Sequence, residues 1–252
     1  MEPVERIKFD NARGQPLVGL LHVPAGAATG TGVVIAHGML SSKDSDKHRN
    51  LCETLAEHGH LALRFDFSGR GESKGVDTEL SFRSDLDDLR RALAFLRRHG
   101  ATRLGLVGSS MGGAASIHVT PIEPDVVAVV TAAAPAYLHS RPSPTWTATW
   151  IEKIREFDHR FEAQPGLFVS PNLFDELAQY DSLVAAEQIR VPWLILHGQF
   201  DELIPVTDAE ALAAANPDAR LEVHPEADHR FSRPEWRDWM VERASKFLDQ
   251  VL

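Results

Sequence analysis

The sequence predicts a single-domain α/β protein in which a mostly parallel sheet is covered by helices on both faces. The chain has 252 residues, a usual length for one α/β domain. Short apolar runs typical of buried strands alternate with longer segments whose apolar residues recur at helical spacing. With 43% hydrophobic and 25% charged residues, the composition is that of a globular protein with a sizeable core.

The chain is expected to begin with an antiparallel hairpin. Residues 4–9 and 16–23 are short extended stretches, and the segment between them, 10–14, is rich in turn-forming residues. A buried-strand run follows at 33–36. After a loop, a helical pattern continues until Gly59, which is a typical helix stop.

The strand–loop–helix unit then repeats. Residues 61–67 have strand character, and apolar residues from Phe82 to Leu96 fall at helical spacing. Acidic residues near the start of this helix and Gly100 beyond its end fit the helix dipole and a C-terminal cap. The remaining candidates are strands at 104–107, 126–131, 193–196 and 221–224, and helices near 110–119, 207–215 and 236–248.

One interval, residues 137–181, breaks this alternation. It contains four prolines and several aromatic residues, so we interpret it as a cap inserted into a core formed by residues 1–136 and 182–252. Aromatic residues at three- and four-residue steps predict at least one amphipathic helix within it.

A candidate nucleophile lies between the strand at 104–107 and the next helix. Residues 108–112 read Gly-Ser-Ser-Met-Gly, which places Ser110 in a Gly-x-Ser-x-Gly pattern. The glycines have a physical reason, because such a serine lies on a cramped turn that exposes its hydroxyl above the sheet and tolerates no bulky neighbours. The alternative is an ordinary helix start with Ser110 as its cap.

A serine hydroxyl is a weak nucleophile, so it needs a general base and a carboxylate that orients the base. In this architecture the order along the chain is serine, acid, histidine, with each partner on a loop after a later strand. Asp201 and His229 meet that order. Glu202 and Asp228 are rival acids, but Asp228 is the neighbour of His229 and would strain to reach its Nδ1.

The negative oxygen of an acyl-transfer intermediate is usually received by two backbone N–H groups. We expect Met111, which follows the nucleophile, and Met39, in the loop after the first core strand, to supply them. Gly38 would allow that loop to approach closely. His37 is expected to pack or bond beneath the loop.

The cap emerges at the sheet edge that carries these residues, so we expect it to roof the site. Its aromatic side chains would then line the substrate pocket; the alternative is that they only pack the insertion against the core. The candidate pocket residues are Trp146, Trp150, Phe157, Phe161 and Phe168.

Other site classes are disfavoured. The glycine-bearing loop at 65–73 lacks the third glycine of a dinucleotide fingerprint and is interpreted as structural, and no Walker or zincin motif appears, so we expect neither a metal nor a cofactor. The single cysteine, Cys52, lies on an apolar helical face and is expected to pack there.

The formal charge of −10 disfavours nucleic acid as a partner, and the longest apolar run is well short of the roughly 18 residues of a membrane span. The first ten residues carry charges where a signal peptide would need an apolar stretch. We therefore expect a cytoplasmic enzyme that acts on a small molecule.

Five motifs occur in the order seen in α/β-hydrolases: His-Gly-Met, Phe-Asp-Phe-Ser-Gly-Arg-Gly-Glu-Ser, Gly-Ser-Ser-Met-Gly-Gly, His-Gly-Gln-Phe-Asp and Ala-Asp-His-Arg-Phe. Within that superfamily the chain most resembles small bacterial carboxylesterases related to cinnamoyl and feruloyl esterases, and serine aminopeptidase-like hydrolases. The resemblance implies the α/β-hydrolase fold, Ser110, Asp201 and His229 as catalytic triad, and Met39 and Met111 as oxyanion-hole amides.

The expected activity is hydrolysis of carboxylic esters of small to medium acyl or aryl groups through an acyl-enzyme. The same triad could instead cleave peptides, amides or thioesters. A catalytically silent protein that binds a ligand in the same pocket is a further alternative. A dehalogenase is disfavoured, because that chemistry would place an aspartate where Ser110 stands.

Overall fold

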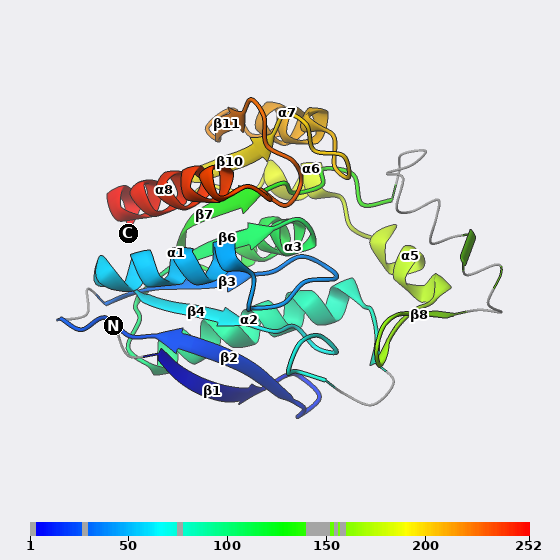
Figure 1. The fold of residues 1–252 in the computed structure, drawn as a ribbon, viewed down its shortest axis with the longest axis horizontal. Helices are drawn as coiled ribbons and strands as arrows, with labels where there is room; N and C mark the ends of the chain where they lie inside the picture. Colours follow the sequence, from blue (N-terminus) through cyan, green and yellow to red (C-terminus); the bar gives the residue numbers. More distant parts are fainter. Residues whose placement is uncertain (1–3, 27–29, 75–77, 140–151, 154–155, 157–159) are drawn as a thin grey trace.

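The computed structural model describes the chain apart from residues 1–3, 27–29, 75–77, 140–151, 154–155 and 157–159. An eight-stranded sheet forms its centre, in the order β1-β2-β4-β3-β6-β7-β10-β11 (Figure 1). The strands are β1 (Val4–Asp10), β2 (Pro16–His22), β3 (Thr31–Ala36), β4 (Leu61–Phe65), β6 (Arg103–Ser109), β7 (Val126–Ala132), β10 (Trp193–Gly198) and β11 (Arg220–His224).

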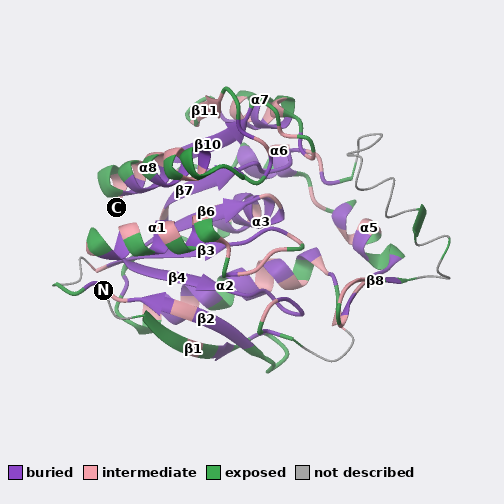
Figure 2. Cartoon of the chain, in the orientation of Figure 1, coloured by how far each residue is buried: buried purple, intermediate pink, exposed green. Residues whose placement is uncertain are grey.

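Strand direction divides the sheet into two parts. β2 runs antiparallel to both β1 and β4, whereas every neighbouring pair from β4 to β11 is parallel. The predicted N-terminal hairpin and mostly parallel sheet are thus confirmed. Figure 2 shows β3 and β6 buried along their length, while β1 at the edge is largely exposed. The parallel strands direct their carboxyl ends, and the loops that follow them, to one edge of the sheet.

Helices cover both faces, as predicted (Figure 1). α1 (Asp46–Glu57) and α8 (Pro234–Val251) pack on one face over a buried apolar cluster that includes Cys52, which therefore packs as expected. The other face is covered by α2 (Phe82–Arg98), α3 (Met111–Val119), α6 (Ser182–Ala186) and α7 (Val206–Ala215), over a second cluster. The 3₁₀ turn Thr120–Ile122 follows α3. Within the described residues, every helix is too short or too polar to cross a membrane.

The inserted segment differs from its predicted form where it is described. Its strands β8 (Phe161–Gln164) and β9 (Leu167–Val169) form a small sheet with β5 (Thr78–Glu79), and α5 (Pro171–Leu177) follows. β9 is parallel to β5, so this part is attached to the core by backbone hydrogen bonds. Phe161, which the helical spacing had included, lies in a strand instead.

Candidate active site

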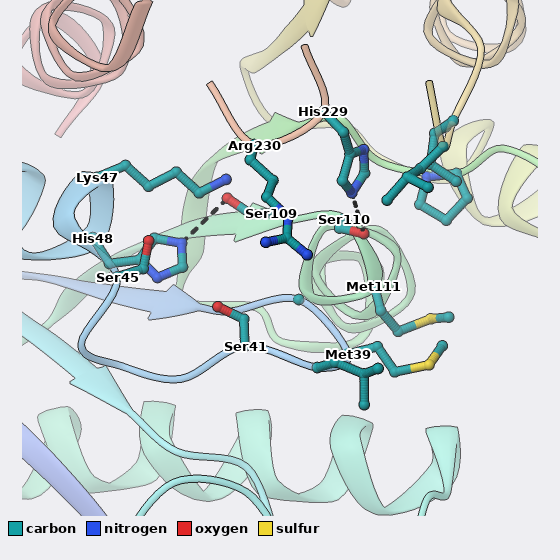
Figure 3. Close-up of a pocket in the computed structure, with 15 residues that line it drawn as sticks. Met39, Ser41, Ser45, Lys47, His48, Ser109, Ser110, Met111, His229 and Arg230 are labelled. Atoms are coloured by element: carbon teal, nitrogen blue, oxygen red, sulfur yellow. Dashed lines mark hydrogen bonds between the residues drawn. The ribbon is translucent and has the colours of Figure 1, made fainter. Parts of the chain in front are cut away.

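The structure brings Ser110, His229 and Asp201 together beyond the carboxyl ends of β6, β11 and β10. The Nε2 atom of His229 lies 3.1 Å from the Oγ atom of Ser110 (Figure 3). On the other side of the ring, Nδ1 lies 2.8 Å from Oδ2 of Asp201. A hydroxyl, an imidazole and a carboxylate therefore form one continuous hydrogen-bonded chain, the arrangement that activates a serine.

The turn that carries Ser110 is strained, and its glycines explain how it forms. Ser110 has φ 55° and ψ −123°, a left-handed conformation that is uncommon for a residue with a side chain. A Cβ atom on Gly108 would overlap the carbonyl oxygen of Gly112, and one on Gly112 would overlap that of Ala36. Ser110 also precedes α3 without making a side-chain capping bond, so the helix-cap alternative does not describe it.

The geometry distinguishes Asp201 from its two rivals. The carboxylate of Asp228 accepts hydrogen bonds from the backbone N–H groups of Arg230 and Ser232, so it shapes its own loop. Glu202 accepts a hydrogen bond from the backbone N–H of His229, at 3.3 Å, and not from its ring. Asp201 is the acid that contacts the imidazole ring.

The side chain of Asp201 is fully buried, and hydrogen bonds hold it from several sides. Its Oδ1 accepts the backbone N–H groups of Leu203 and Ile204, at 2.9 and 2.7 Å. Oδ2 lies 3.2 Å from Nε2 of His197, a buried residue that the sequence reasoning did not select. Burial opposes the charge, but the hydrogen bonds from His197 and His229 outweigh it and hold the pKa of Asp201 well below its ordinary value. The carboxylate is therefore ionised at neutral pH.

The two expected oxyanion-hole residues both line the cavity beside Ser110. Met111 is the first residue of α3, where a backbone N–H has no acceptor within the helix. Met39 follows Gly38, at which a Cβ atom would lie only 3.2 Å from that of Ser110. The loop after β3 therefore approaches the nucleophile closely, in the position from which the N–H of Met39 could contact an oxyanion.

His37 lies beneath that loop. Its Nδ1 is 2.7 Å from the carbonyl oxygen of Gly38, and its Nε2 accepts the backbone N–H of Phe67. Burial, together with the nearby Arg70 cation, lowers the pKa of His37 to about 3, so the ring is neutral. The expected packing role of His37 is confirmed.

Behind the loop lies a buried group of charged side chains, which we call the rear network: Lys43, Arg64, Asp66, Arg70 and Asp85. Asp66 accepts hydrogen bonds from Nζ of Lys43, at 3.0 Å, and from the backbone N–H of Lys43. Arg70 forms a bidentate pair with Asp85 and also lies 3.4 Å from the carbonyl oxygen of Met39. The 65–73 loop is therefore structural, as interpreted, and it supports the loop that carries Met39.

A cavity of about 400 Å³ opens beside Ser110, within the usual size range of small-molecule sites. It is lined by Gly38, Met39, Leu40, Ser41, Ser45, Lys47, His48, Ser109, Ser110, Met111, Pro135, Leu203, Ile204, His229 and Arg230. Sequence reasoning missed Lys47, His48 and Arg230. The only available signal was that Arg230 directly follows His229 in the sequence.

The aromatic pocket residues need correction. Phe161 and Phe168 are not among the residues that line this cavity. Phe161 is buried in the core cluster, and Phe168, on β9, lies under the guanidinium of Arg160. Both belong to the small sheet, in which Phe161 pairs with Val169 and Phe168 pairs with Glu79. Trp146, Trp150 and Phe157 lie outside the described residues.

Over the described part of the chain, no cluster of three or more histidine, cysteine, aspartate or glutamate side chains could hold a metal ion. Cys52 is buried, and its burial raises the pKa of the thiol above its ordinary value.

Two family models match the chain. Residues 28–163 match the family described as serine aminopeptidase, S33, and residues 177–251 match the dienelactone hydrolase family. The first match covers Met39 and Ser110, and the second covers Asp201 and His229.

The chain is also similar to individual known proteins. The mitochondrial palmitoyl-protein thioesterase ABHD10 of Mus musculus is 27% identical over 208 residues, which covers 79% of this chain and 69% of the relative. Est1E of Butyrivibrio proteoclasticus, with ferulic acid bound, superposes with a TM-score of 0.79 at 19% identity, covering 97% of this chain and 98% of that one. An esterase domain from Rhodothermus marinus superposes with a TM-score of 0.74 at 23% identity, covering 99% of each chain.

Proposed function

Because the chain belongs to the serine aminopeptidase S33 family of hydrolases, we propose that it hydrolyses carboxylic esters of small to medium acyl or aryl groups. The observation that supports this most strongly is the hydrogen-bonded chain from Ser110 through His229 to Asp201, at the wall of a cavity of about 400 Å³. In this proposal Ser110 is the nucleophile, His229 the general base and Asp201 the residue that orients it.

In the first half of the reaction, Oγ of Ser110 attacks the ester carbonyl carbon while Nε2 of His229 accepts the serine proton. The ionised Asp201 stabilises the imidazolium that forms. The N–H groups of Met39 and Met111 donate to the oxyanion of the tetrahedral intermediate. The bond to the alcohol then breaks, and His229 returns its proton to the departing alkoxide.

The second half uses the same groups with water as the nucleophile. His229 takes a proton from the water, whose oxygen attacks the acyl carbon, and the second oxyanion occupies the same pair of N–H groups. Collapse of this intermediate breaks the bond to Oγ, and the proton on His229 returns to Ser110. The products are one carboxylic acid and one alcohol.

Thioester hydrolysis is a second candidate, favoured by the similarity to a palmitoyl-protein thioesterase. The same steps apply with a thiolate in place of the alkoxide. The cavity supports esters of modest size better than long chains, because a palmitoyl chain extends over about 20 Å.

The test is a fluorophosphonate probe together with matched p-nitrophenyl esters and acyl thioesters. We expect labelling of Ser110 itself and not of the adjacent Ser109, and loss of turnover by about a millionfold in Ser110→Ala. Ser84→Ala, a serine substitution on α2, serves as the matched control and should keep full activity. Labelling of a different serine, or an active Ser110→Ala protein, would contradict the assignment.

A further inference from the structure

The cavity beside Ser110 has two chemically different sides. Its apolar side is formed by Met39, Leu40, Met111, Pro135, Leu203 and Ile204. Its polar side is formed by Ser41, Ser45, Lys47, His48, Ser109 and Arg230. In Figure 3, Lys47 and His48 lie across the cavity from Met39 and Met111, and the guanidinium of Arg230 points into the space between them.

The polar side carries the two cationic side chains Lys47 and Arg230. Among the described residues that line the cavity, none has a carboxylate. Within the described residues, neither Nζ of Lys47 nor the guanidinium of Arg230 has a carboxylate oxygen within ion-pair distance, and Lys47 contacts the ring of Phe231 instead. The whole chain has a formal charge of −10, so the positive charge of the cavity is a local feature and does not reflect the overall composition.

Fold stability does not explain the position of Lys47. It lies in the first turn of α1, where the helix dipole disfavours a cation, and Asp46 occupies the favoured acidic position beside it. Burial lowers the pKa of Lys47 to about 8, which Asp201 and Asp228 partly oppose and Arg230 reinforces. The two carboxylates thus offset the burial of Lys47 only in part, and an anion in the cavity would supply the remaining counter-charge.

We propose that Lys47 and Arg230 form an anion subsite for a carboxylate of the substrate. The preferred substrates are esters that carry this carboxylate a few bonds from the scissile carbonyl. The inference rests on the proposed esterase function and specifies its substrate class. The planar guanidinium of Arg230 suits a carboxylate, and the hydroxyl groups of Ser41, Ser45 and Ser109 can donate hydrogen bonds to it.

The same arrangement disfavours neutral esters. A neutral group that fills the polar side would take two cations out of water without providing a counter-charge, which is costly. The subsite would therefore favour anionic esters by charge attraction and disfavour neutral esters through the cost of removing the two cations from water. The apolar side, next to the expected oxyanion-hole residues, is left to the uncharged end of the ester.

Two matched pairs of esters test this inference. In the first pair the carboxylate is on the acyl side: p-nitrophenyl hydrogen glutarate against p-nitrophenyl methyl glutarate. In the second it is on the alcohol side: 4-(carboxymethyl)phenyl butanoate against its methyl ester. The quantity measured is the ratio of kcat/KM for the anionic member to that for the neutral member, in the parent and in variants.

We expect a ratio of at least about ten in one of the two pairs for the parent, and the pair that shows it identifies the side that carries the carboxylate. Lys47→Gln and Arg230→Gln should each lower that ratio about tenfold, since each tenfold step corresponds to about 1.4 kcal/mol of lost interaction. Lys47→Arg should keep it. The surface substitutions Lys8→Gln and Arg98→Gln are matched controls and should leave the ratio unchanged.

A preference for the neutral member of both pairs would overturn the inference, as would an unchanged ratio in Lys47→Gln and Arg230→Gln proteins that retain their melting temperature. In either case the proposed esterase function survives, because the neutral esters are still cleaved. If the parent cleaves none of the four esters, the esterase proposal itself fails and the anion subsite fails with it.

Discussion

Lys43 and Lys47 are only four positions apart in the sequence but belong to two different regions of the molecule. Lys43, in the rear network, is fully buried and contacts the carboxylates of Asp44, Asp66 and Glu72. Burial opposes its charge, but these hydrogen bonds outweigh it and raise the pKa of Lys43 above its ordinary value. Lys47 faces the cavity, and burial lowers its pKa to about 8.

This difference suggests a way to distinguish charges that stabilise the fold from charges that serve ligand binding. A buried cation that is surrounded by carboxylates has its partners within the fold, so its removal should affect stability. A cation that lines a cavity without such a partner gains one only when a ligand binds, so its removal should affect specificity. Four predictions test this division, in order of decreasing effect.

The largest effect is expected at the buried carboxylate that takes part in the proposed chemistry. Asp201→Asn should fold normally but lose about three to four powers of ten in kcat, because the amide no longer stabilises the imidazolium of His229. Asp228→Asn is the control, since the carboxylate of Asp228 accepts hydrogen bonds from residues of its own loop. Steady-state kinetics on both variants would identify the acid. A large loss in Asp228→Asn alone would mean that the acid is misassigned.

The same substitution at the two lysines should separate the regions. Lys43→Met leaves the buried carboxylate of Asp66 without its cation, which we expect to lower the free energy of unfolding by about 3–5 kcal/mol. Lys47→Met should change it by less than about 1 kcal/mol, because it removes a cation that opposes the dipole of α1. Urea unfolding monitored by circular dichroism measures both. If both substitutions lowered the free energy of unfolding equally, the proposed distinction between the two regions would be wrong.

Acid should weaken the region behind the site. Burial lowers the pKa of His37 to about 3, and burial with the Arg64 charge lowers that of His22 to about 4. The native rings therefore stay neutral while the unfolded chain binds protons below about pH 6.5. Stability is full above that pH and should fall by up to about 1.4 kcal/mol per pH unit for each ring as the pH approaches 4.

The His22→Gln variant checks this effect. Its amide oxygen can still accept the hydrogen bond that Nε of Arg64 donates to His22, but it does not titrate. The free energy of unfolding should therefore fall less steeply between pH 6.5 and 4, by about 1.4 kcal/mol per pH unit, which corresponds to one proton fewer taken up on unfolding. An identical slope would show that His22 is not neutral in the folded protein.

The smallest effect concerns the cavity itself. Lys47 is charged below about pH 8, so the preference for an anionic over a neutral ester should fall a few-fold between pH 7 and 9. Asp201 and Asp228, with lowered pKa values, and Arg230 keep their charges across that range. In Lys47→Arg the ratio of kcat/KM values should stay flat with pH. A parallel decline in parent and variant would exclude Lys47 as the cause.

Local patterns made part of the site predictable from sequence. The glycines around Ser110 predict the turn because each one relieves a steric overlap within a few residues. Chain order then selects Asp201 and His229, because both follow parallel strands that end at the same sheet edge as β6. Asp228 was a weaker candidate because it is adjacent to His229, and in the structure its carboxylate accepts hydrogen bonds within its own loop instead.

What the sequence did not predict depends on contacts between distant residues. Thr78 pairs with Leu167 in a small sheet whose strands have two to four residues, too short to show any periodicity. The spacing of Phe161 from the preceding aromatic residues therefore predicted a helix where the structure has a strand. Lys47 is one of 26 lysine and arginine residues, and only the folded arrangement reveals that no carboxylate contacts it among the described residues.

The distance along the chain between Ser110 and its base has a consequence for protein synthesis. The two residues are 119 positions apart, and at roughly 5–20 residues per second the ribosome needs about 6 to 24 s to translate from one to the other. During that interval the nascent polypeptide contains the strained serine turn without the imidazole that would activate it. A prematurely terminated product that ends before β11 contains no His229, so under the proposed mechanism it would lack the general base and could not hydrolyse esters.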